Sequence, residues 1–283
     1  MILATMRAQT RITERDLVAF VNRRSRGRIA QHLPGAGPVD LWVVKVTEDG
    51  PLGVPAARDL LGTQPSDARQ RIDDRRRSLV ARAALARLAG ARTHVDPAAV
   101  VIAHDERGRP VLRDCPALHV SVAHSGEFVA CAISGRRVGV DVERTDRPEA
   151  DDALAARVCA PTERLRLEHM PAEPRRRALI RLWVRKEALA KALGVGLALP
   201  FEQLDVRHDI PLIGGIRAGA LRVRDVDGGP DGYAVAIAAE GRGFRLRAHL
   251  IVGDSAWPMT ARSAAGPGHD HPVAGRRRGG NRP

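Results

Sequence analysis

Residues 119–143 read HVSVAHSGEFVACAISGRRVGVDVE, and this stretch decides the fold. Two apolar runs flank a short polar connection at 124–127, and a second turn at 134–137 leads into a third apolar run at 138–143. Short runs of this kind, bounded by glycine, serine and charged residues, predict three β-strands joined by tight turns.

Further elements are predicted on both sides of this stretch. Upstream, we expect a strand at 41–46 and a helix at about 72–89. Downstream, one helix is expected to begin near Pro161, with Thr162 as its cap, and a longer one to run from about 175 to 193, where Gly194 ends it. Strands are then expected at 204–206, 221–226, 233–238 and 244–252.

The chain contains a weak internal repeat. A glycine followed by an apolar run at 126–133 has a counterpart at 232–238, and each copy is followed by a turn and another predicted strand. We therefore predict an α+β fold with two similar α/β subdomains, related by a pseudo-two-fold repeat. The first half is expected to cover 39–137 and the second 138–254.

The positive charge of the chain is concentrated at its two ends. The net charge is +13, of which residues 1–38 contribute +5 and residues 255–283 contribute +4. We expect a basic, partly disordered N-terminal extension and a disordered tail rich in Arg, Gly and Pro. The body carries only +4, and aromatic residues make up 3% of the chain, which argues against a nucleic-acid-binding protein.

The sequence predicts neither a membrane protein nor a secreted one. No apolar run reaches the roughly 18 residues that a membrane-spanning helix needs, and Arg7 interrupts the apolar start before a signal peptide could form. The three cysteines, at 115, 131 and 159, form no CxxC motif and are odd in number. We therefore expect a cytoplasmic protein without a disulfide framework.

Asp141 and Glu143 are the strongest candidate metal ligands. They occupy positions i and i+2 of a predicted strand, so their carboxylates share one face while Val140 and Val142 share the other. Two adjacent carboxylates repel each other, and a divalent cation such as Mg²⁺, which prefers oxygen ligands, would relieve that repulsion. Taken alone, the same pattern is also typical of a solvent-exposed strand edge.

A second set of candidates lies on the long predicted helix. Trp183, Glu187 and Lys191 follow one another at intervals of four residues and therefore share one helix face. Glu187 could supply a third carboxylate to the metal, and Lys191 an ammonium group to a phosphate. The alternative is an exposed Glu187–Lys191 ion pair, for which this order of residues is favourable. Trp183 is expected to be in the core in either case.

Two weaker features indicate an anionic ligand. His124 lies between two predicted strands, close to Gly126, where ring and backbone N–H groups could approach an anion. Arg75, Arg76 and Arg77 precede Ser78 near the start of a predicted helix, where amide and guanidinium donors favour phosphate. The alternatives are an ordinary turn histidine and an arginine-rich helix surface.

Together, and in this order, the motifs resemble the 4′-phosphopantetheinyl transferases. The resemblance rests on Gly108-Arg109-Pro110 and on the segments 120–126, 138–143, 183–191 and 194–197. The pairing of Gly-x-Asp-x-Glu with Trp-x-x-Lys-Glu-Ala-x-x-Lys is specific to that family, and the chain is similar to its longer, two-repeat Sfp type over roughly residues 40–252. The resemblance implies the fold of that family, with the active site at the interface between the two halves.

The resemblance also implies a role for each matching residue. Asp141, Glu143 and Glu187 would bind the metal, Glu187 would also be the general base, and Lys191 would contact a phosphate. The residues implied in coenzyme A binding are Arg77, Ser78, Gly108, Arg109, Pro110, His124 and Ser125. Arg109 stands where the family has lysine, and Ala123 where it often has serine, so the nucleotide contacts are expected to differ.

The implied reaction moves the 4′-phosphopantetheine arm of coenzyme A, the co-substrate, onto a serine of an apo acyl or peptidyl carrier protein. Adenosine 3′,5′-bisphosphate is released, Mg²⁺ is the implied cofactor, and a chain with both halves is expected to be a monomer. The first alternative is another Mg²⁺-dependent enzyme that cleaves a phosphoryl or pyrophosphate bond with the same three acids. The second is a non-enzymatic basic binding protein that uses the charged ends.

Overall fold

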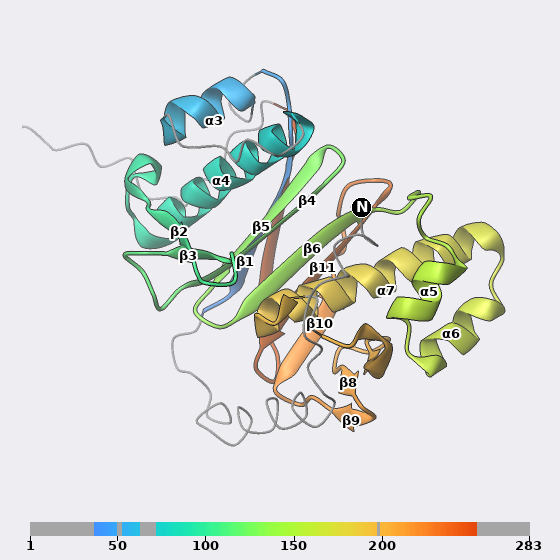
Figure 1. The fold of residues 1–283 in the computed structure, drawn as a ribbon. Helices are drawn as coiled ribbons and strands as arrows, with labels where there is room; N and C mark the ends of the chain where they lie inside the picture. Colours follow the sequence, from blue (N-terminus) through green and yellow to red (C-terminus); the bar gives the residue numbers. More distant parts are fainter. Residues whose placement is uncertain (1–36, 50–52, 63–71, 197–198, 254–283) are drawn as a thin grey trace, which may run out of the picture.

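The structure is a computed structural model that describes residues 37–49, 53–62, 72–196 and 199–253 (Figure 1). Residues 1–36 of the predicted N-terminal extension and the whole predicted tail at 255–283 lie outside the described residues.

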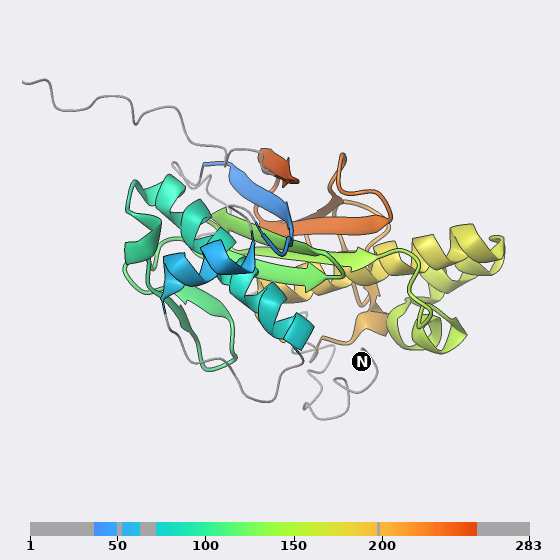
Figure 2. The same cartoon turned by 90° about the horizontal axis from the view of Figure 1, so that it is seen from above.

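Four strands form the first sheet, in the order β12-β1-β5-β4. The strands β4 (His119–Ser125), β5 (Phe128–Ser134) and β1 (Val39–Lys45) pair antiparallel, and β12 (Leu246–Ile251) lies parallel to β1 at the edge. Figure 2 shows β12 beside β1, although they come from opposite ends of the described chain. All seven residues of β5 are buried, which explains its continuous apolar run.

The second sheet is antiparallel and has three strands. Its order is β10-β11-β6, with β10 at Leu221–Asp225, β11 at Tyr233–Glu240 and β6 at Val138–Arg144. The hydroxyl of Ser121 on β4 accepts a hydrogen bond from the backbone N–H of Val140 on β6 at 3.0 Å. The two sheets therefore meet along β4 and β6.

One long helix covers the outer face of each sheet (Figure 1). α4 (Ile72–Thr93) packs on the first sheet and α7 (Ala172–Leu193) on the second. The strand β1 shows how the core is divided, because Trp42 and Val44 pack with α4 whereas Leu41 and Val43 face the second sheet. The predicted α+β fold with two similar α/β subdomains is confirmed, since each sheet is mainly antiparallel and is covered by one long helix.

Shorter elements complete the two halves. Those of the first half are α3 (Val54–Leu61), η1 (Pro97–Ala99) and the hairpin of β2 (Ile102–His104) and β3 (Pro110–Leu112). Those of the second half are α5 (Asp152–Val158), α6 (Pro161–Glu168), η3 (Phe201–Gln203) and a small sheet of β7 (Leu204–Asp205), β8 (Leu212–Ile213) and β9 (Ile216–Arg217). Within the described ranges, no helix combines the length and the apolar character needed to cross a membrane.

The predicted elements differ from the observed ones in a few places. β4 extends to Ser125, so His124 lies in the strand and not in the connection after it. The predicted cap of α6 was wrong, because Pro161 takes the first helical position and makes Ala160 the N-cap. Thr162 instead donates its hydroxyl hydrogen to Asp205 at 2.9 Å, and the side chain of Glu163 accepts from the N–H of Ala160 at 2.9 Å.

Candidate active site

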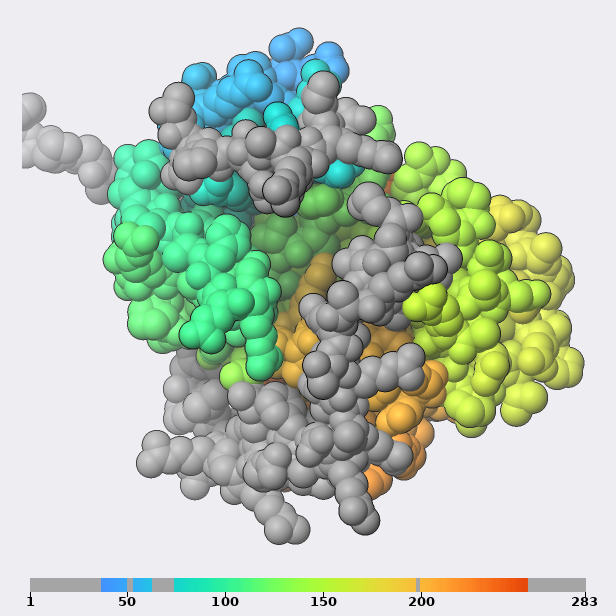
Figure 3. Space-filling model, viewed as in Figure 1, coloured from blue at the N-terminus to red at the C-terminus, as the bar shows by residue number. Residues whose placement is uncertain are grey.

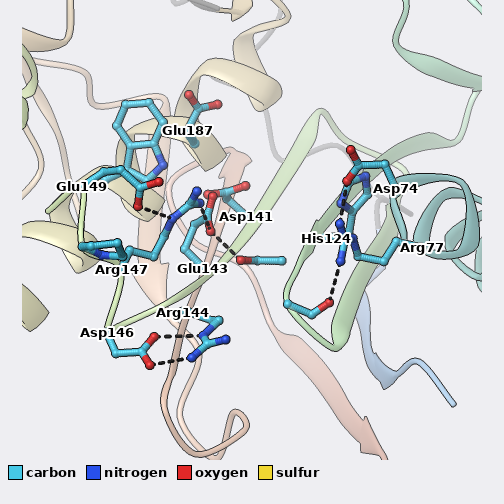
Figure 4. A pocket seen from close by; sticks show the side chains of 14 residues that line it. Asp74, Arg77, His124, Asp141, Glu143, Arg144, Asp146, Arg147, Glu149 and Glu187 are labelled. Atoms are coloured by element: carbon cyan, nitrogen blue, oxygen red, sulfur yellow. Dashed lines mark hydrogen bonds and ion pairs between the residues drawn. The ribbon is translucent and has the colours of Figure 1, made fainter. Parts of the chain in front are cut away.

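A pocket of about 590 Å³ is lined by residues of both sheets and both long helices (Figure 4). In the space-filling view the surface is hollowed between the side that carries α4 and the side that carries α5 and α6 (Figure 3). Six residues predicted for the site line this pocket, together with the buried Trp183: Arg77, His124, Ser125, Asp141, Glu143 and Glu187.

The strand β6 directs two carboxylates toward α7. Val140 and Val142 are 0% and 1% exposed in the core between the sheets, so the alternation of the strand turns Asp141 and Glu143 to the other face. Asp141 is buried at 6% exposure, whereas the side chain of Glu143 is 13% exposed. The strand is therefore not a solvated edge at this point, and the two acids are held in a partly enclosed site.

The helix α7 brings the third acid and a cation to the same place. Glu187 lines the pocket, and the ammonium group of Lys191 lies 2.8 Å from Oδ1 of Asp141. The half-buried lysine of this site therefore pairs with the acid on β6, not with Glu187 one turn earlier on its own helix.

Burial and mutual repulsion make two of these acids weak. Burial raises the pKa of Asp141 to about 6, although Lys191 opposes the shift. Burial and the charge of Asp141 raise the pKa of Glu187 to about 7. Burial disfavours the charge of Lys191, but Asp141 and Glu187 outweigh that effect and raise its pKa. A carboxyl group that titrates near neutral pH is suited to accept a proton.

The donor set fits a hard divalent cation. Oδ2 of Asp141 is buried and has no hydrogen-bond partner among the described residues. Among the described residues, no group of three or more His, Cys, Asp or Glu side chains is already close enough together to hold a metal ion. Mg²⁺ does not need such a group, because it commonly binds one or two carboxylates and completes its coordination shell with phosphate and water oxygens. Acids also outnumber bases in the lining, with six carboxylates (Asp74, Asp141, Glu143, Asp146, Glu149, Glu187) against three arginines (Arg77, Arg144, Arg147).

The opposite wall of the pocket supplies donors for an anion. The guanidinium of Arg77, on α4, donates to the carbonyl of Gly126 at 3.2 Å and to Asp74 at 2.6 Å, which fixes its position (Figure 4). Burial, with the nearby charges of Arg77 and Lys191, lowers the pKa of His124. The imidazole is therefore neutral at neutral pH and can donate one hydrogen bond without adding charge.

Glu143 has two partners that motif reasoning did not connect with it. Its Oε2 accepts hydrogen bonds from the hydroxyl of Ser125 at 2.5 Å and from Arg147 at 2.6 Å. Arg147 was not predicted for the site, because it lies in the loop after β6 and belongs to none of the motifs. A charged residue four positions after Glu143 is the only signal that could have indicated the contact.

The remaining predicted site residues are not among those that line the pocket. Ser78 follows Arg77 on α4, and the turn Gly108-Arg109-Pro110 lies beside the C-terminal end of α7. There Arg107 donates to the carbonyl of Gly194 at 2.7 Å, and Arg109 pairs with Asp105 at 2.8 Å. Any nucleotide contact of these residues therefore lies outside the pocket that holds the acids.

Comparisons with known proteins show which family the sequence is similar to. The sequence profile of the 4′-phosphopantetheinyl transferase superfamily matches residues 137–238, which include Asp141, Glu143, Glu187 and Lys191. A 4′-phosphopantetheinyl transferase of Bacillus subtilis is 31% identical over 162 residues, which are 55% of this chain and 70% of that protein. The transferase HetI of a Nostoc strain is 32% identical over 181 residues, which are 59% of this chain and 73% of HetI.

Solved structures also match part of the chain. A holo-(acyl-carrier-protein) synthase from Bacillus anthracis, in complex with CoA (3′,5′-ADP), aligns with 37% of this chain and 95% of its own, at 23% identity and a TM-score of 0.31. The identity of the chain to the two transferases, over 70% and 73% of their lengths, establishes that it belongs to the 4′-phosphopantetheinyl transferase superfamily.

Proposed function

We propose that this enzyme transfers the 4′-phosphopantetheine arm of coenzyme A to a serine of an apo acyl or peptidyl carrier protein and releases adenosine 3′,5′-bisphosphate. The observation that carries the proposal is the pocket itself, in which Asp141, Glu143 and Glu187 from one half face Arg77 and His124 from the other. Acids that can hold a cation therefore lie opposite donors that can hold a phosphate.

The residues of the first half are suited to bind the pyrophosphate of coenzyme A. Arg77 is a fixed guanidinium and His124 a neutral donor, and Lys191 adds an ammonium group from α7. Donors that are already in place lose little free energy to reorganisation when charge develops on the bridging oxygen. We assign Ser78, Gly108, Arg109 and Pro110 to the adenine and ribose phosphate end of coenzyme A.

Asp141, Glu143 and Glu187 are proposed to hold Mg²⁺. When bound, the ion would neutralise the pyrophosphate charge and polarise the phosphorus–oxygen bond that breaks. The carboxylates themselves bind the cation only when deprotonated, so the raised pKa values of Asp141 and Glu187 imply competition between protons and metal.

Glu187 is also proposed to remove the proton of the carrier serine, directly or through water. In the metal-free protein, burial and the charge of Asp141 raise the pKa of Glu187 to about 7, and a positioned general base typically contributes ~10²–10⁴-fold to the rate. Trp183 lies one turn before it and packs edge to face on Phe201, at 5.6 Å between ring centroids. This packing fixes the part of α7 that carries the base.

We propose further that the enzyme is a cytoplasmic monomer. One chain supplies both walls of the pocket, and all three cysteines are free, as a reducing compartment requires. Light scattering coupled to size-exclusion chromatography would test the monomer, because a dimer at working concentrations contradicts it.

The direct test is mass spectrometry of a panel of apo carrier proteins after incubation with coenzyme A and Mg²⁺. The proposal predicts a carrier whose mass increases by one phosphopantetheine arm, and loss of most of that turnover in Glu187→Ala. The matched control is Glu173→Ala, an exposed glutamate at the start of the same helix. Cleavage of coenzyme A or another pyrophosphate without modification of any carrier would instead favour the alternative phosphoryl-transfer enzyme.

A further inference from the structure

We propose that Ser125 is a positioning residue for the metal site. Its hydroxyl holds one carboxylate oxygen of Glu143, so that the other oxygen is left to bind the cation. This inference rests on the proposed function, because it assigns a role toward the cation that Asp141, Glu143 and Glu187 are proposed to bind. It gives Ser125 a different role from the coenzyme A contact that the family resemblance implies.

The hydrogen bonds of Glu143 all converge on one oxygen. Ser125 and Arg147 both donate to Oε2, at 2.5 and 2.6 Å, and no donor from the described part of the chain reaches Oε1. A carboxylate held by one oxygen in this way has a fixed rotamer and leaves the other oxygen for a metal ion. Such outer partners of a ligating carboxylate orient it and tune its affinity.

The Ser125–Glu143 bond also joins the two halves of the molecule. Ser125 ends β4 in the first sheet, and Glu143 lies on β6 in the second. Ser125 is 9% exposed and the side chain of Glu143 13%, so the bond lies largely buried at the wall of the pocket. The first half therefore contributes to the metal site through a hydroxyl and not through a ligand.

The turn that carries Ser125 is held firmly enough for this role. Gly126 adopts a φ of +53°, and a Cβ atom there would lie 2.2 Å from the hydroxyl of Tyr233 on β11. That hydroxyl accepts a hydrogen bond from the N–H of Glu127 at 3.1 Å, and the ring packs edge to face on Phe128 at 4.9 Å. These contacts fix the turn against the second sheet, with the Ser125 hydroxyl directed at Glu143.

The chain offers a matched control for this serine. Ser121 lies on the same strand and also makes a hydroxyl hydrogen bond to β6, but its partner is the backbone N–H of Val140 at 3.0 Å. Ser121→Ala therefore also removes a hydroxyl hydrogen bond between the same two strands, one in which the hydroxyl accepts, and it does so without touching a carboxylate. A purely structural role of Ser125 predicts the same behaviour for both variants.

The experiment is a Mn²⁺ titration of the full-length protein without coenzyme A, followed by electron paramagnetic resonance of the free ion. We expect Ser125→Ala to raise the Mn²⁺ dissociation constant about tenfold or more. Ser125→Thr, which keeps the hydroxyl, should have the dissociation constant of the unmodified protein. Ser121→Ala should also leave the dissociation constant unchanged, whatever its effect on the melting temperature. Glu143→Gln should weaken Mn²⁺ binding at least as much as Ser125→Ala.

Two kinds of result would overturn the inference, and they are distinguishable. If Glu143→Gln weakens Mn²⁺ binding but Ser125→Ala changes only the affinity for coenzyme A, the positioning role is wrong and the proposed function stands. If the unmodified protein binds no Mn²⁺, or if Glu143→Gln binds it normally, the magnesium site and the positioning role both fail. Circular dichroism of each variant confirms that a loss of binding is not a loss of folding.

Discussion

At Glu187 the buried carboxylate that the proposed chemistry requires lowers the stability of the folded protein at neutral and higher pH. Burial and the charge of Asp141 raise its pKa from the ordinary value of 4.5 to about 7, and no hydrogen bond from the described residues reaches the carboxylate. Because folding raises this pKa, the folded protein takes up a proton that the unfolded chain releases. The resulting stabilisation is fully present below about pH 4.5 and is lost as the pH rises through about 7.

We therefore expect Glu187→Gln to stabilise the metal-free protein at pH 8 and to change its stability little at pH 5. The amide cannot ionise, so it removes the unfavourable burial of a charge, worth on the order of 3 kcal/mol for a pKa raised from 4.5 to about 7 at about 1.4 kcal/mol per pKa unit. Urea denaturation in the presence of EDTA at the two pH values measures the difference. Glu173→Gln, exposed on the same helix, should have little effect at either pH, and an equal gain for Glu187→Gln at pH 5 would contradict the argument.

At the scale of the element, α7 serves two purposes on two faces. Glu187 lines the pocket and Lys191 pairs with Asp141 on β6, whereas Lys186 is fully buried on the side of α5 and α6. The ammonium group of Lys186 donates to Glu163 and to the carbonyl of Val158, both at 2.5 Å, and to the carbonyl of Phe201 at 2.9 Å. Lys186 thus anchors α7 directly before Glu187, the proposed general base.

Lys186→Met is expected to destabilise the protein strongly, by about 3–5 kcal/mol, because it leaves the Glu163 carboxylate buried without its cation. Adding Glu163→Gln should recover part of the loss, since the second change removes the unpaired charge. Chemical denaturation of the two single variants and the double variant measures the coupling. Strictly additive losses would show that the two side chains do not depend on each other.

The contact between α7 and β6 depends on Gly139. A Cβ atom at this position would lie 2.0 Å from the carbonyl oxygen of Ala188 and 2.4 Å from the backbone nitrogen of Ala192. The helix backbone therefore rests directly on the strand, and this close approach brings Lys191 within reach of Asp141.

We expect Gly139→Ala to push α7 away from β6, with a loss of at least ~3 kcal/mol or failure to fold. The matched control is Gly243→Ala, because an added Cβ atom there meets nothing within 4 Å. Melting temperatures of the two variants measure the difference. A melting temperature of Gly139→Ala that equals that of the control would show that the helix can shift without loss.

At the scale of the whole molecule, local sequence patterns predict the helices and strands better than they predict which strands pair and which distant side chains come into contact. The alternation at 138–143 places both acids on one face because Val140 and Val142 are needed in the core. No local pattern indicates that β12 pairs with β1, since that contact depends on which sheet edge is open. Arg147 was missed for a similar reason, because its contact with Glu143 follows from the path of a loop.

The parallel pairing of β12 with β1 joins the end of the described chain to its beginning. Six residue pairs, from Val39–Leu246 to Val44–Ile251, form this edge, and Arg247 pairs with Asp40 at 2.5 Å. Ile251 is 2% exposed in the core under α4. The predicted boundary at 137/138 therefore separates two sequence halves that are not separate folding units, because the first sheet takes its edge strand from the second half.

A chain that ends after Arg245 is expected to be much less stable than one that ends after Gly253. The shorter chain leaves the hydrogen-bonding edge of β1 unpaired, and an exposed apolar edge strand promotes pairing between molecules. We expect a lower melting temperature and aggregation on size-exclusion chromatography for the shorter chain, and a monomer for the longer one. If the shorter chain stayed monomeric with the same melting temperature, β12 would be a dispensable addition to the first sheet.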